Sequence, residues 1–202
     1  MINKNPLDSG NVVGAVFLDL KKAFDTLNHN ILVSKLSPFN LSKNIVNLFK
    51  FYLRNREQCV KVDRQTSSFL KNTMGIPQGS ILGPLLFSLF INDMPKTCPD
   101  NGIQLYADDA VIYAPAKSPS KAAEILTDHM YGVHQWLERN HLVLNLNKTV
   151  SMCFSIRKRC QLERFCVKIK AQEIQEVNEF KFLGVILDPQ LRFEKHVKKI
   201  SK

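Results

Sequence analysis

The sequence lacks a long hydrophobic run, a paired-cysteine motif and an apolar N-terminal stretch. Its longest apolar run, Ile81 to Ile91, covers about 11 residues and is interrupted by glycine, proline and serine, so it is too short to span a bilayer. The first residues, MINKNPLDSG, carry no apolar core of a signal peptide. These absences predict an intracellular protein, in the nucleus, the cytoplasm or both, with no membrane partner.

Cysteine is scarce and its spacing forms no known ligand motif. The five cysteines, Cys59, Cys98, Cys153, Cys160 and Cys166, include no CxxC pair, and their number is odd. This argues against a disulfide framework and against a zinc site. We therefore expect free thiols.

Charge is distributed unevenly along the chain. Lys and Arg number 28 against 18 Asp and Glu, a formal net charge of +10. Residues 1–85 carry a net charge of +6, residues 86–144 carry −3 and residues 145–202 carry +7. Basic surface binds a phosphate backbone because neutralised phosphates release their counterions. The two basic segments therefore favour a nucleic-acid partner, and the acidic middle segment needs a separate explanation.

The apolar periodicity predicts an α+β fold. The continuous apolar run Val12–Leu18 is typical of a strand buried on both faces, and helices are expected after the capping residues Asn28 and Ser42. Further helices are expected at Leu82–Met94 (apolar all round and so expected to be buried), at Ser120–Asn140 and from Phe193, and strands at Glu57–Thr73 (a hairpin turning near Asp63–Gln65), Ile103–Ala107, Val111–Ala114, Met152–Ile156, Val167–Ile169 and Phe180–Leu187. This order favours an antiparallel sheet with helices on one face, in a ferredoxin-like split β-α-β arrangement.

Three aspartates stand at the ends of predicted strands. Asp19 follows the first strand, and Asp108 and Asp109 lie at the expected tip of a hairpin. Adjacent carboxylates repel each other unless a cation compensates, and Mg²⁺ prefers carboxylate and phosphate oxygens. In a basic chain this set points to phosphoryl or nucleotidyl transfer assisted by two metal ions. Taken singly, each aspartate also fits a polar turn or a capping residue.

Five segments, in order, resemble the palm motifs of non-LTR retrotransposon reverse transcriptases. They are FLDLKKAFD (residues 17–25), GIPQGSILGPLLF (75–87), YADD (106–109), LNLNKT (144–149) and FLGVILD (182–188). The amino-acid sequence around these motifs is most similar to that of LINE elements of the jockey and CR1 type. YADD alone is weak evidence, whereas the ordered set is specific.

The resemblance implies an RNA-directed DNA polymerase with defined residue roles. Asp19 and Asp108 would ligate two Mg²⁺ ions, or Mn²⁺ in their place, with Asp109 assisting. A DNA primer 3′-hydroxyl would attack the α-phosphate of a dNTP on an RNA or DNA template, and Lys148 would protonate or neutralise the pyrophosphate. Nucleotide binding is implied for Leu20, Lys21, Lys22, Ala23, Phe24 (the steric gate), Gln78 and Gly79, and a primer grip for Phe182, Leu183 and Gly184.

The same resemblance implies a domain layout. One reverse transcriptase domain, residues 1–202, would hold a polymerase palm at 12–115 with a partial fingers insertion near 28–73. The rest of the palm and the primer-grip hairpin would lie at 116–190, and the start of a truncated thumb at 191–202. The thumb and endonuclease of a longer polyprotein are expected partners absent from this chain. Two alternatives stay open: an inactive relic that only binds nucleic acid, and another two-metal phosphotransferase such as a nucleotide cyclase.

Overall fold

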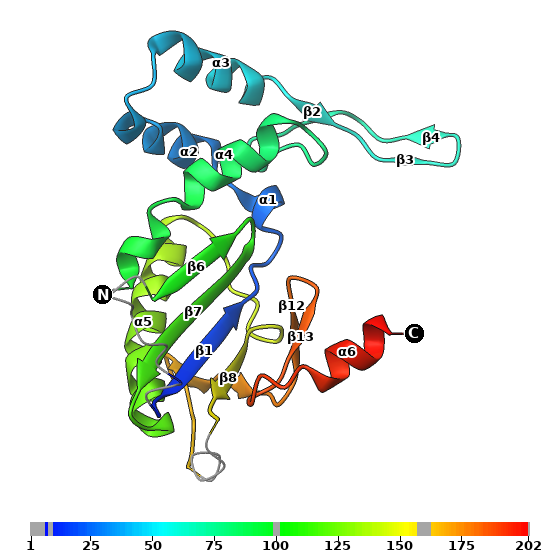
Figure 1. Ribbon diagram of the computed structural model, residues 1–202. Coiled ribbons are helices and arrows are strands. Elements are labelled where there is room, and N and C mark those ends of the chain that lie inside the picture. Colours follow the sequence, from blue (N-terminus) through cyan, green and yellow to red (C-terminus); the bar gives the residue numbers. More distant parts are fainter. Residues whose placement is uncertain (1–6, 8–9, 99–101, 157–162, 202) are drawn as a thin grey trace. The chain divides into compact units, whose positions relative to one another are not determined.

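The computed structural model describes residue 7 and residues 10–98, 102–156 and 163–201 (Figure 1). The chain forms two compact units. Unit 1 comprises Met1–Asp19, Pro95–Trp136 and Leu144–Lys202, and unit 2 comprises Leu20–Met94 and Leu137–Val143. The chain therefore leaves unit 1 directly after Asp19.

Unit 1 is built on a five-stranded sheet with the strand order β11-β8-β1-β7-β6. The strands are β1 (Val12–Leu18), β6 (Ile103–Tyr106), β7 (Asp109–Ala116), β8 (Val150–Phe154) and β11 (Gln175–Glu176). The first four are antiparallel neighbours, in the order of a split β-α-β arrangement. Strand β11 pairs with β8 in parallel. The prediction of a purely antiparallel sheet is therefore wrong at this edge, where two exposed polar residues give no apolar strand pattern.

Helix α5 (Pro119–Arg139) covers one face of this sheet (Figure 1). Leu126, Met130 and Val133 on its apolar stripe are fully buried, as the helical spacing predicts. The helix approaches β1 closely because Gly14 has no side chain. A Cβ at Gly14 would lie 2.7 Å from Leu126 and 2.9 Å from Phe165.

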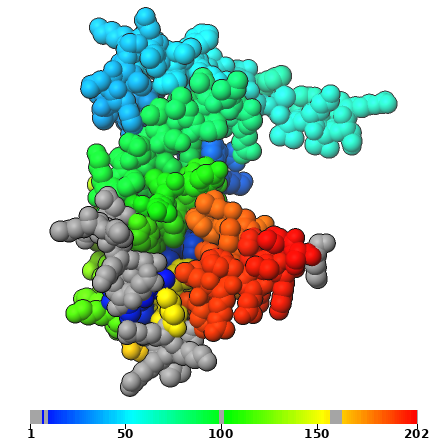
Figure 2. Space-filling model, in the orientation of Figure 1, coloured from blue at the N-terminus to red at the C-terminus, as the bar shows by residue number. Residues whose placement is uncertain are grey.

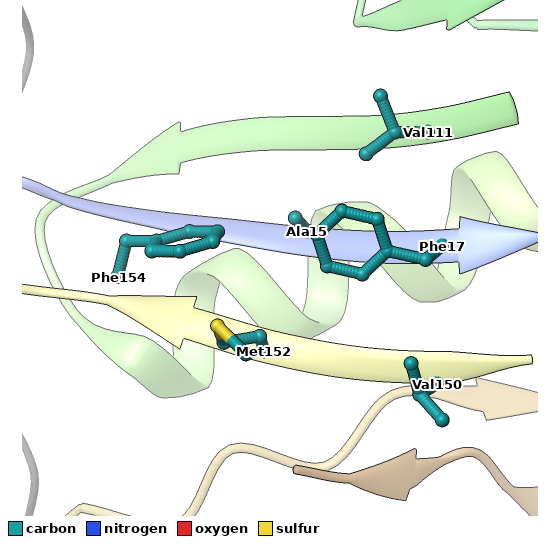
Figure 3. Packing of buried hydrophobic residues seen from close by; sticks show 6 residues of the cluster. All are labelled: Ala15, Phe17, Val111, Val150, Met152 and Phe154. Atoms are coloured by element: carbon teal, nitrogen blue, oxygen red, sulfur yellow. The ribbon is translucent and has the colours of Figure 1, made fainter. Parts of the chain in front are cut away.

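The opposite face of the sheet carries a second apolar layer. Figure 3 shows its core residues side by side on three strands: Ala15, Phe17, Val111, Val150, Met152 and Phe154. The hairpin of β12 (Phe180–Phe182) and β13 (Val185–Leu187) packs against this layer. The ring of Phe17 lies 4.7 Å from that of Phe180 and 5.2 Å from that of Phe182, between centroids. Both faces of β1 are thus covered, which explains its continuous apolar run.

The remaining elements of unit 1 are short. Strands β9 (Lys168–Ile169) and β10 (Gln172–Glu173) pair with each other, and helix α6 (Glu194–Ile200) begins where a helix was predicted. Asp188 organises the turn before α6. Although partial burial acts to raise its pKa, hydrogen bonds from the backbone N–H groups of Phe193, Arg192 and Gln190 hold that pKa below its ordinary value.

Unit 2 contains most of the remaining helices. They are α1 (Ala23–Thr26), α2 (His29–Lys35), the 3₁₀ turn η1 (Ser37–Phe39), α3 (Lys43–Leu53) and α4 (Leu82–Ile91). The two predicted caps are confirmed. The side chain of Asn28 accepts hydrogen bonds from two backbone N–H groups at the start of α2, and Ser42 accepts one at the start of α3.

A two-stranded β-ribbon extends from the helices of unit 2, as the alternating pattern predicts. Strand β2 (Glu57–Gln58) pairs with β5 (Leu70–Lys71), and β3 (Lys61–Val62) pairs with β4 (Gln65–Thr66). Figure 2 shows it as a narrow cyan arm. Its strand residues are exposed on both faces.

Helix α4 is shorter and less buried than predicted. It ends at Ile91, and Met94–Thr97 forms a separate 3₁₀ turn, η2. Leu86 and Phe87 are fully buried, but Leu85 is 49% exposed. Although α4 is apolar on every side, one side of it remains exposed.

The described residues bear on membrane-spanning helices and on disulfides, two features that the sequence was expected to lack. No helix among them is long and apolar enough to cross a bilayer. Among the described residues, Cys59, Cys98, Cys153 and Cys166 form no disulfide, and Cys160 lies outside them.

Candidate active site

Asp19 and Asp109 meet at one end of the two central strands. Strands β1 and β7 are antiparallel, with Leu18 opposite Ala110. Asp19 directly follows Leu18 and Asp109 directly precedes Ala110, so the two carboxylates lie one residue beyond this last pair. Opposed residues in an antiparallel pair have Cα atoms about 4.5–5.5 Å apart. Strand pairing thus brings together two of the three predicted carboxylates.

The turn between β6 and β7 carries the third carboxylate. Tyr106 pairs with Asp109, so the two turn residues are Ala107 and Asp108. The prediction had both aspartates at the tip, whereas Asp109 is the first residue of β7. Ala107 has the left-handed φ of 52° that such a tight turn requires. For a residue with a Cβ this conformation costs on the order of 1 kcal/mol.

A cavity of about 300 Å³ opens beside these carboxylates. Its lining residues are Phe17, Leu18, Asp19, Asp109, Lys148, Phe180 and Phe182. It combines an apolar wall from the sheet and the β12–β13 hairpin with two carboxylates and one ammonium group. The lysine of the fourth motif therefore shares a cavity with the aspartate of the first.

The three carboxylates influence one another electrostatically. Partial burial, then the charge of Asp108, then that of Asp19 raise the pKa of Asp109 above its ordinary value. Like charges that face each other across paired strands are destabilising unless a cation compensates. This clustering of oxygen donors suits a hard divalent cation. Within the described residues no group of three or more His, Cys, Asp or Glu side chains is placed so that it could hold a metal ion. Mg²⁺ sites commonly complete their ligands with water and substrate phosphate.

The loop after α5 holds Asp19 through its backbone and its side chain. The backbone N–H of Asn145 donates to the carbonyl of Asp19 at 2.8 Å, and the backbone N–H of Asp19 donates to Thr149 Oγ1 at 3.3 Å. The side-chain Nδ2 of Asn145 donates to Asp19 Oδ2 at 2.8 Å. Sequence reasoning selected only Lys148 from this motif. It missed Asn145 and Thr149, whose single signal was their position inside the motif.

The predicted primer-grip residues lie on the β12–β13 hairpin. Leu183 and Gly184 form its two-residue turn, with φ of 46° and 86°, and positive φ at both positions is typical of a type I′ turn. Leu183 is 49% exposed, and none of the described atoms lies within 4 Å of a Cβ built at Gly184. Phe182, next to this turn, lines the cavity that Asp19 and Asp109 also line. The hairpin therefore extends from the cavity to an exposed turn.

In unit 2, two of the predicted nucleotide-binding residues are held by side-chain contacts. The ring of Phe24 stacks on the buried ring of Phe87, with centroids 4.4 Å apart and planes at 20°. Gln78 Nε2 donates to Asp25 Oδ1 at 3.0 Å. The first and second motifs are therefore linked inside this unit.

Backbone hydrogen bonds strengthen the same link. The N–H of Gly75 donates to Leu27 O and the N–H of Ile76 donates to Phe24 O, each at 2.7 Å. His29 Nε2 lies 2.6 Å from Gly75 O. Gly75 has a φ of +80°, and a Cβ there would lie 2.7 Å from the Asp25 carbonyl oxygen. Glycine is thus required at this crossing.

The other predicted nucleotide contacts differ in their availability. Gly79 has a φ of +76°, and no atom of the described residues lies within 4 Å of a Cβ built there. Lys22, also in the left-handed region, precedes α1 and is exposed, whereas Ala23 is buried. Lys21 donates its N–H to Val143 O at 2.8 Å. A triphosphate contact through that N–H would have to break this hydrogen bond. Leu20, the remaining predicted nucleotide contact in this segment, is half-buried.

The family described as reverse transcriptase (RNA-dependent DNA polymerase) matches residues 5–187 of the chain. The chain belongs to this family. This reverse transcriptase domain is 32% identical over 196 residues to the probable RNA-directed DNA polymerase from transposon X-element of Drosophila melanogaster, covering 94% of this chain and 21% of that protein. It is 30% identical over 200 residues to the RNA-directed DNA polymerase from mobile element jockey of Drosophila funebris, covering 95% and 21%. The resemblance drawn from the five motifs is confirmed, and the chain spans about a fifth of the length of these curated relatives.

Solved structures give the same fold. The reverse transcriptase domain matches the structure of apo telomerase from Candida tropicalis truncated from the C-terminal domain, with a TM-score of 0.62 and 17% identity, over 91% of this chain and 35% of that one. It also matches telomerase from Candida albicans in complex with a fragment of telomeric RNA, with a TM-score of 0.59 and 16% identity, over 87% and 29%. At such identities the likeness shows the fold alone. The α+β prediction is confirmed as a reverse transcriptase-like fold.

Proposed function

We propose that this reverse transcriptase domain is the catalytic core of an RNA-directed DNA polymerase from a non-LTR retrotransposon of the jockey type. It would add deoxynucleotides to a primer 3′-hydroxyl on an RNA or DNA template. The observation that carries this proposal is the cavity at the ends of β1 and β7, where Asp19, Asp109 and Lys148 converge. In this assignment residues 12–115 would form the palm with a partial fingers insertion near 28–73, residues 116–190 the rest of the palm with the primer-grip hairpin, and residues 191–202, which include α6, the start of a thumb.

Asp19, Asp108 and Asp109 are the residues that would hold two Mg²⁺ or Mn²⁺ ions. When bound, such ions neutralise charge on the attacking and leaving oxygens of nucleotidyl transfer. Partial burial raises the pKa of Asp109 most, and repulsion from Asp108 and Asp19 raises it further; a bound cation would relieve that repulsion, which supports this role. The ammonium group of Lys148, at the same cavity, would neutralise the departing pyrophosphate.

Two features of unit 2 would select the incoming nucleotide. The Phe24 ring is held flat on Phe87 and would occupy the space of a ribose 2′-hydroxyl. The loop at Gln78 and Gly79 would pack against the nucleotide and the template, with Gln78 oriented by Asp25. The hairpin tip at Leu183–Gly184 would hold the primer end.

A primer-extension assay tests the proposal. The 202-residue chain is incubated with an RNA template annealed to a DNA primer, dNTPs and Mg²⁺. We expect extension by the wild type and none by Asp19→Ala or Asp108→Ala. Asp128→Asn, which removes an exposed carboxylate from α5, serves as the charge control and should extend normally. Undiminished extension by Asp108→Ala would show that the metal site is assigned wrongly.

A basic cleft in unit 2 favours a second function, nucleic-acid binding without synthesis. Lys50, Arg54, Arg56 and Lys71 are among the residues that line this cavity of about 430 Å³. Arg56 is preorganised: its Nε donates to Tyr52 O at 2.7 Å, and its guanidinium lies 4.5 Å from the centre of the Tyr52 ring. Fixed cations along a cleft suit a phosphate backbone.

Gel shifts at several salt concentrations test this second function. Replacing Lys50, Arg54 and Lys71 together by alanine should lower the slope of log affinity against log salt by about 2–3, since each phosphate contact contributes about 0.7–0.9. Salt-dependent binding with no nucleotide incorporation at any enzyme concentration would leave binding as the function of this chain.

A further inference from the structure

We propose that Asn145 is a positioning residue for Asp19: its side-chain amide fixes the Asp19 carboxylate in the orientation that uptake of a divalent cation requires. The inference rests on the proposed function, because it concerns the metal site assigned there. It gives a role to a residue of the fourth motif other than its lysine.

The backbone and the side chain of Asn145 make separate hydrogen bonds. The backbone N–H of Asn145 donates to the Asp19 carbonyl at 2.8 Å, and its carbonyl accepts from the N–H groups of Lys148 and Thr149 at 3.1 and 2.9 Å. These bonds close the loop and dock it beside β1 whatever the side chain. The side-chain Nδ2 makes a further bond, 2.8 Å long and partly buried, to Asp19 Oδ2. Because an ionised carboxylate only accepts hydrogen bonds, the nitrogen of the amide must face it.

The position of Asp19 explains why such a bond is needed. Asp19 and Asp109 lie one residue beyond the last pair of β1 and β7 and line the same cavity, and the neighbour of Asp109 in the turn is Asp108. Before a cation arrives, a free carboxylate would lower its energy by turning away from the other two. One hydrogen bond from Asn145 opposes that rotation without adding charge. A carboxylate offers about four lone-pair sites, so a single donor leaves the remainder for a cation.

The same loop attaches Asp19 at a second point. The backbone N–H of Asp19 donates to Oγ1 of Thr149, a fully buried residue, at 3.3 Å. Main chain and carboxylate of Asp19 are thus held by two residues four apart in one loop. The first bond locates the residue, and among the described residues it is the Asn145 amide that donates to the carboxylate itself. Outer hydrogen bonds of this kind typically change metal affinity by about 10–100-fold.

A nucleotide-free Mn²⁺ titration, followed by the electron paramagnetic resonance signal of unbound Mn²⁺, tests the inference on the 202-residue chain. We expect Asn145→Ala and the near-isosteric Asn145→Leu to bind Mn²⁺ at least about 10-fold more weakly than the wild type. Asn147→Ala, in the same loop and exposed, should bind as the wild type does. Asp19→Ala defines the loss of the site.

Folding and catalysis are measured in parallel. Circular dichroism and thermal unfolding in EDTA identify any variant that does not fold, and Asn145→Leu serves if Asn145→Ala fails. In primer extension we expect Asn145→Ala to raise the Mg²⁺ concentration at half-maximal rate by about 10-fold, with the KM for template–primer unchanged.

The outcomes separate the inference from the proposed function. Folded Asn145 variants that bind Mn²⁺ as tightly as the wild type would overturn the role of Asn145 and leave the polymerase assignment intact. Weakened Mn²⁺ binding by these variants supports the inference, and it would do so even if the wild type extended no primer, a result that removes the polymerase assignment alone. Wild-type Mn²⁺ binding that Asp19→Ala does not reduce would overturn both.

Discussion

The ring of Phe24, at the first motif, lies flat on the ring of Phe87, which belongs to the buried side of α4. The centroids are 4.4 Å apart and the planes meet at 20°. Phe87 is fully buried and Phe24 half-buried, so the core residue fixes the orientation of the more accessible one. In the proposed steric-gate role of Phe24, a ring held in this way would resist displacement by a nucleotide sugar.

The stacked pair predicts the sugar selectivity of the enzyme. Phe24→Val should raise incorporation of ribonucleotides relative to deoxynucleotides by up to about 100-fold, the order of discrimination available to a pocket that must reject one added hydroxyl. Competing single-nucleotide additions measure the ratio. Phe51→Val, at a phenylalanine 81% exposed on α3, is the control and should leave the ratio unchanged. An unaltered ratio in Phe24→Val would show that another residue excludes the ribose.

The carboxylate cluster predicts a pH-dependent stability cost. The pKa of Asp109 is raised by partial burial, Asp108 and Asp19, so its ionisation opposes folding. The stability that a neutral Asp109 provides is fully present below its ordinary pKa of about 3.8 and is lost as the pH rises through the higher folded-state pKa. Asp109→Asn should therefore stabilise the metal-free chain at pH 7 by about 0.5 kcal/mol, since a like-charged pair facing across strands costs about 0.2–1 kcal/mol.

Thermal unfolding in EDTA at several pH values measures this cost. The Tm of Asp109→Asn should exceed that of the wild type by about 1–2 °C at neutral pH, and the gain should disappear in acid. The exposed Asp128→Asn shows what removal of a carboxylate outside this cluster does. A lower Tm for Asp109→Asn at pH 7 would contradict the sign of the shift.

Packing of α5 on β1 predicts a coupled pair of core substitutions. Gly14→Ala would place a Cβ 2.7 Å from Leu126 and should destabilise the fold by about 1–3 kcal/mol through overpacking. Leu126→Ala should cost about 2–5 kcal/mol by leaving a cavity. Because the new methyl group enters that cavity, the double variant should be more stable than the sum of the single effects by at least about 0.5 kcal/mol. Denaturant unfolding of all four chains measures the coupling, and strict additivity would disprove the contact.

The hydrogen bond from Gln78 to Asp25 predicts that replacing the exposed Asp25 lowers kcat/KM for the incoming dNTP. Asp25→Ala frees the Gln78 amide, and we expect kcat/KM for dNTP to fall roughly 10-fold, since a 1 Å misplacement can cost about 100-fold. Single-turnover addition measures the effect. Asp63→Ala, at the exposed turn of the ribbon, is the matched control. Equal kinetics for the two variants would mean that Gln78 is positioned by other contacts.

Local signals in the sequence predicted the elements that depend on short-range chemistry. The run at β1 reads as a strand because its alternate residues face α5 and the β12–β13 hairpin. The Asn28 and Ser42 caps were predictable because a cap bonds to N–H groups only two or three residues away. Family resemblance supplied the site residues, and the register of β1 with β7 explains why Asp19 and Asp109 meet.

Features that depend on distant partners were beyond local patterns. The parallel strand β11 is two polar residues long, and it forms through pairing with β8, where Gln175 lies opposite Val150. The Asn145 bond to Asp19 spans 126 residues, and no periodicity encodes it. The exposed side of α4 is apolar in composition, so no local pattern could show that Leu85 would remain uncovered.

The chain order of the central sheet has a consequence for protein synthesis. Val12 pairs with Ala116, and Val13 pairs with Phe154, so β1 emerges from the ribosome long before either neighbour exists. At about 5–20 residues per second, this apolar strand waits roughly 5–20 s for its first partner. Unpaired apolar strands are sites of aggregation. Nascent chains released before β7 is translated should therefore depend on chaperones, and recombinant fragments ending there should accumulate as inclusion bodies.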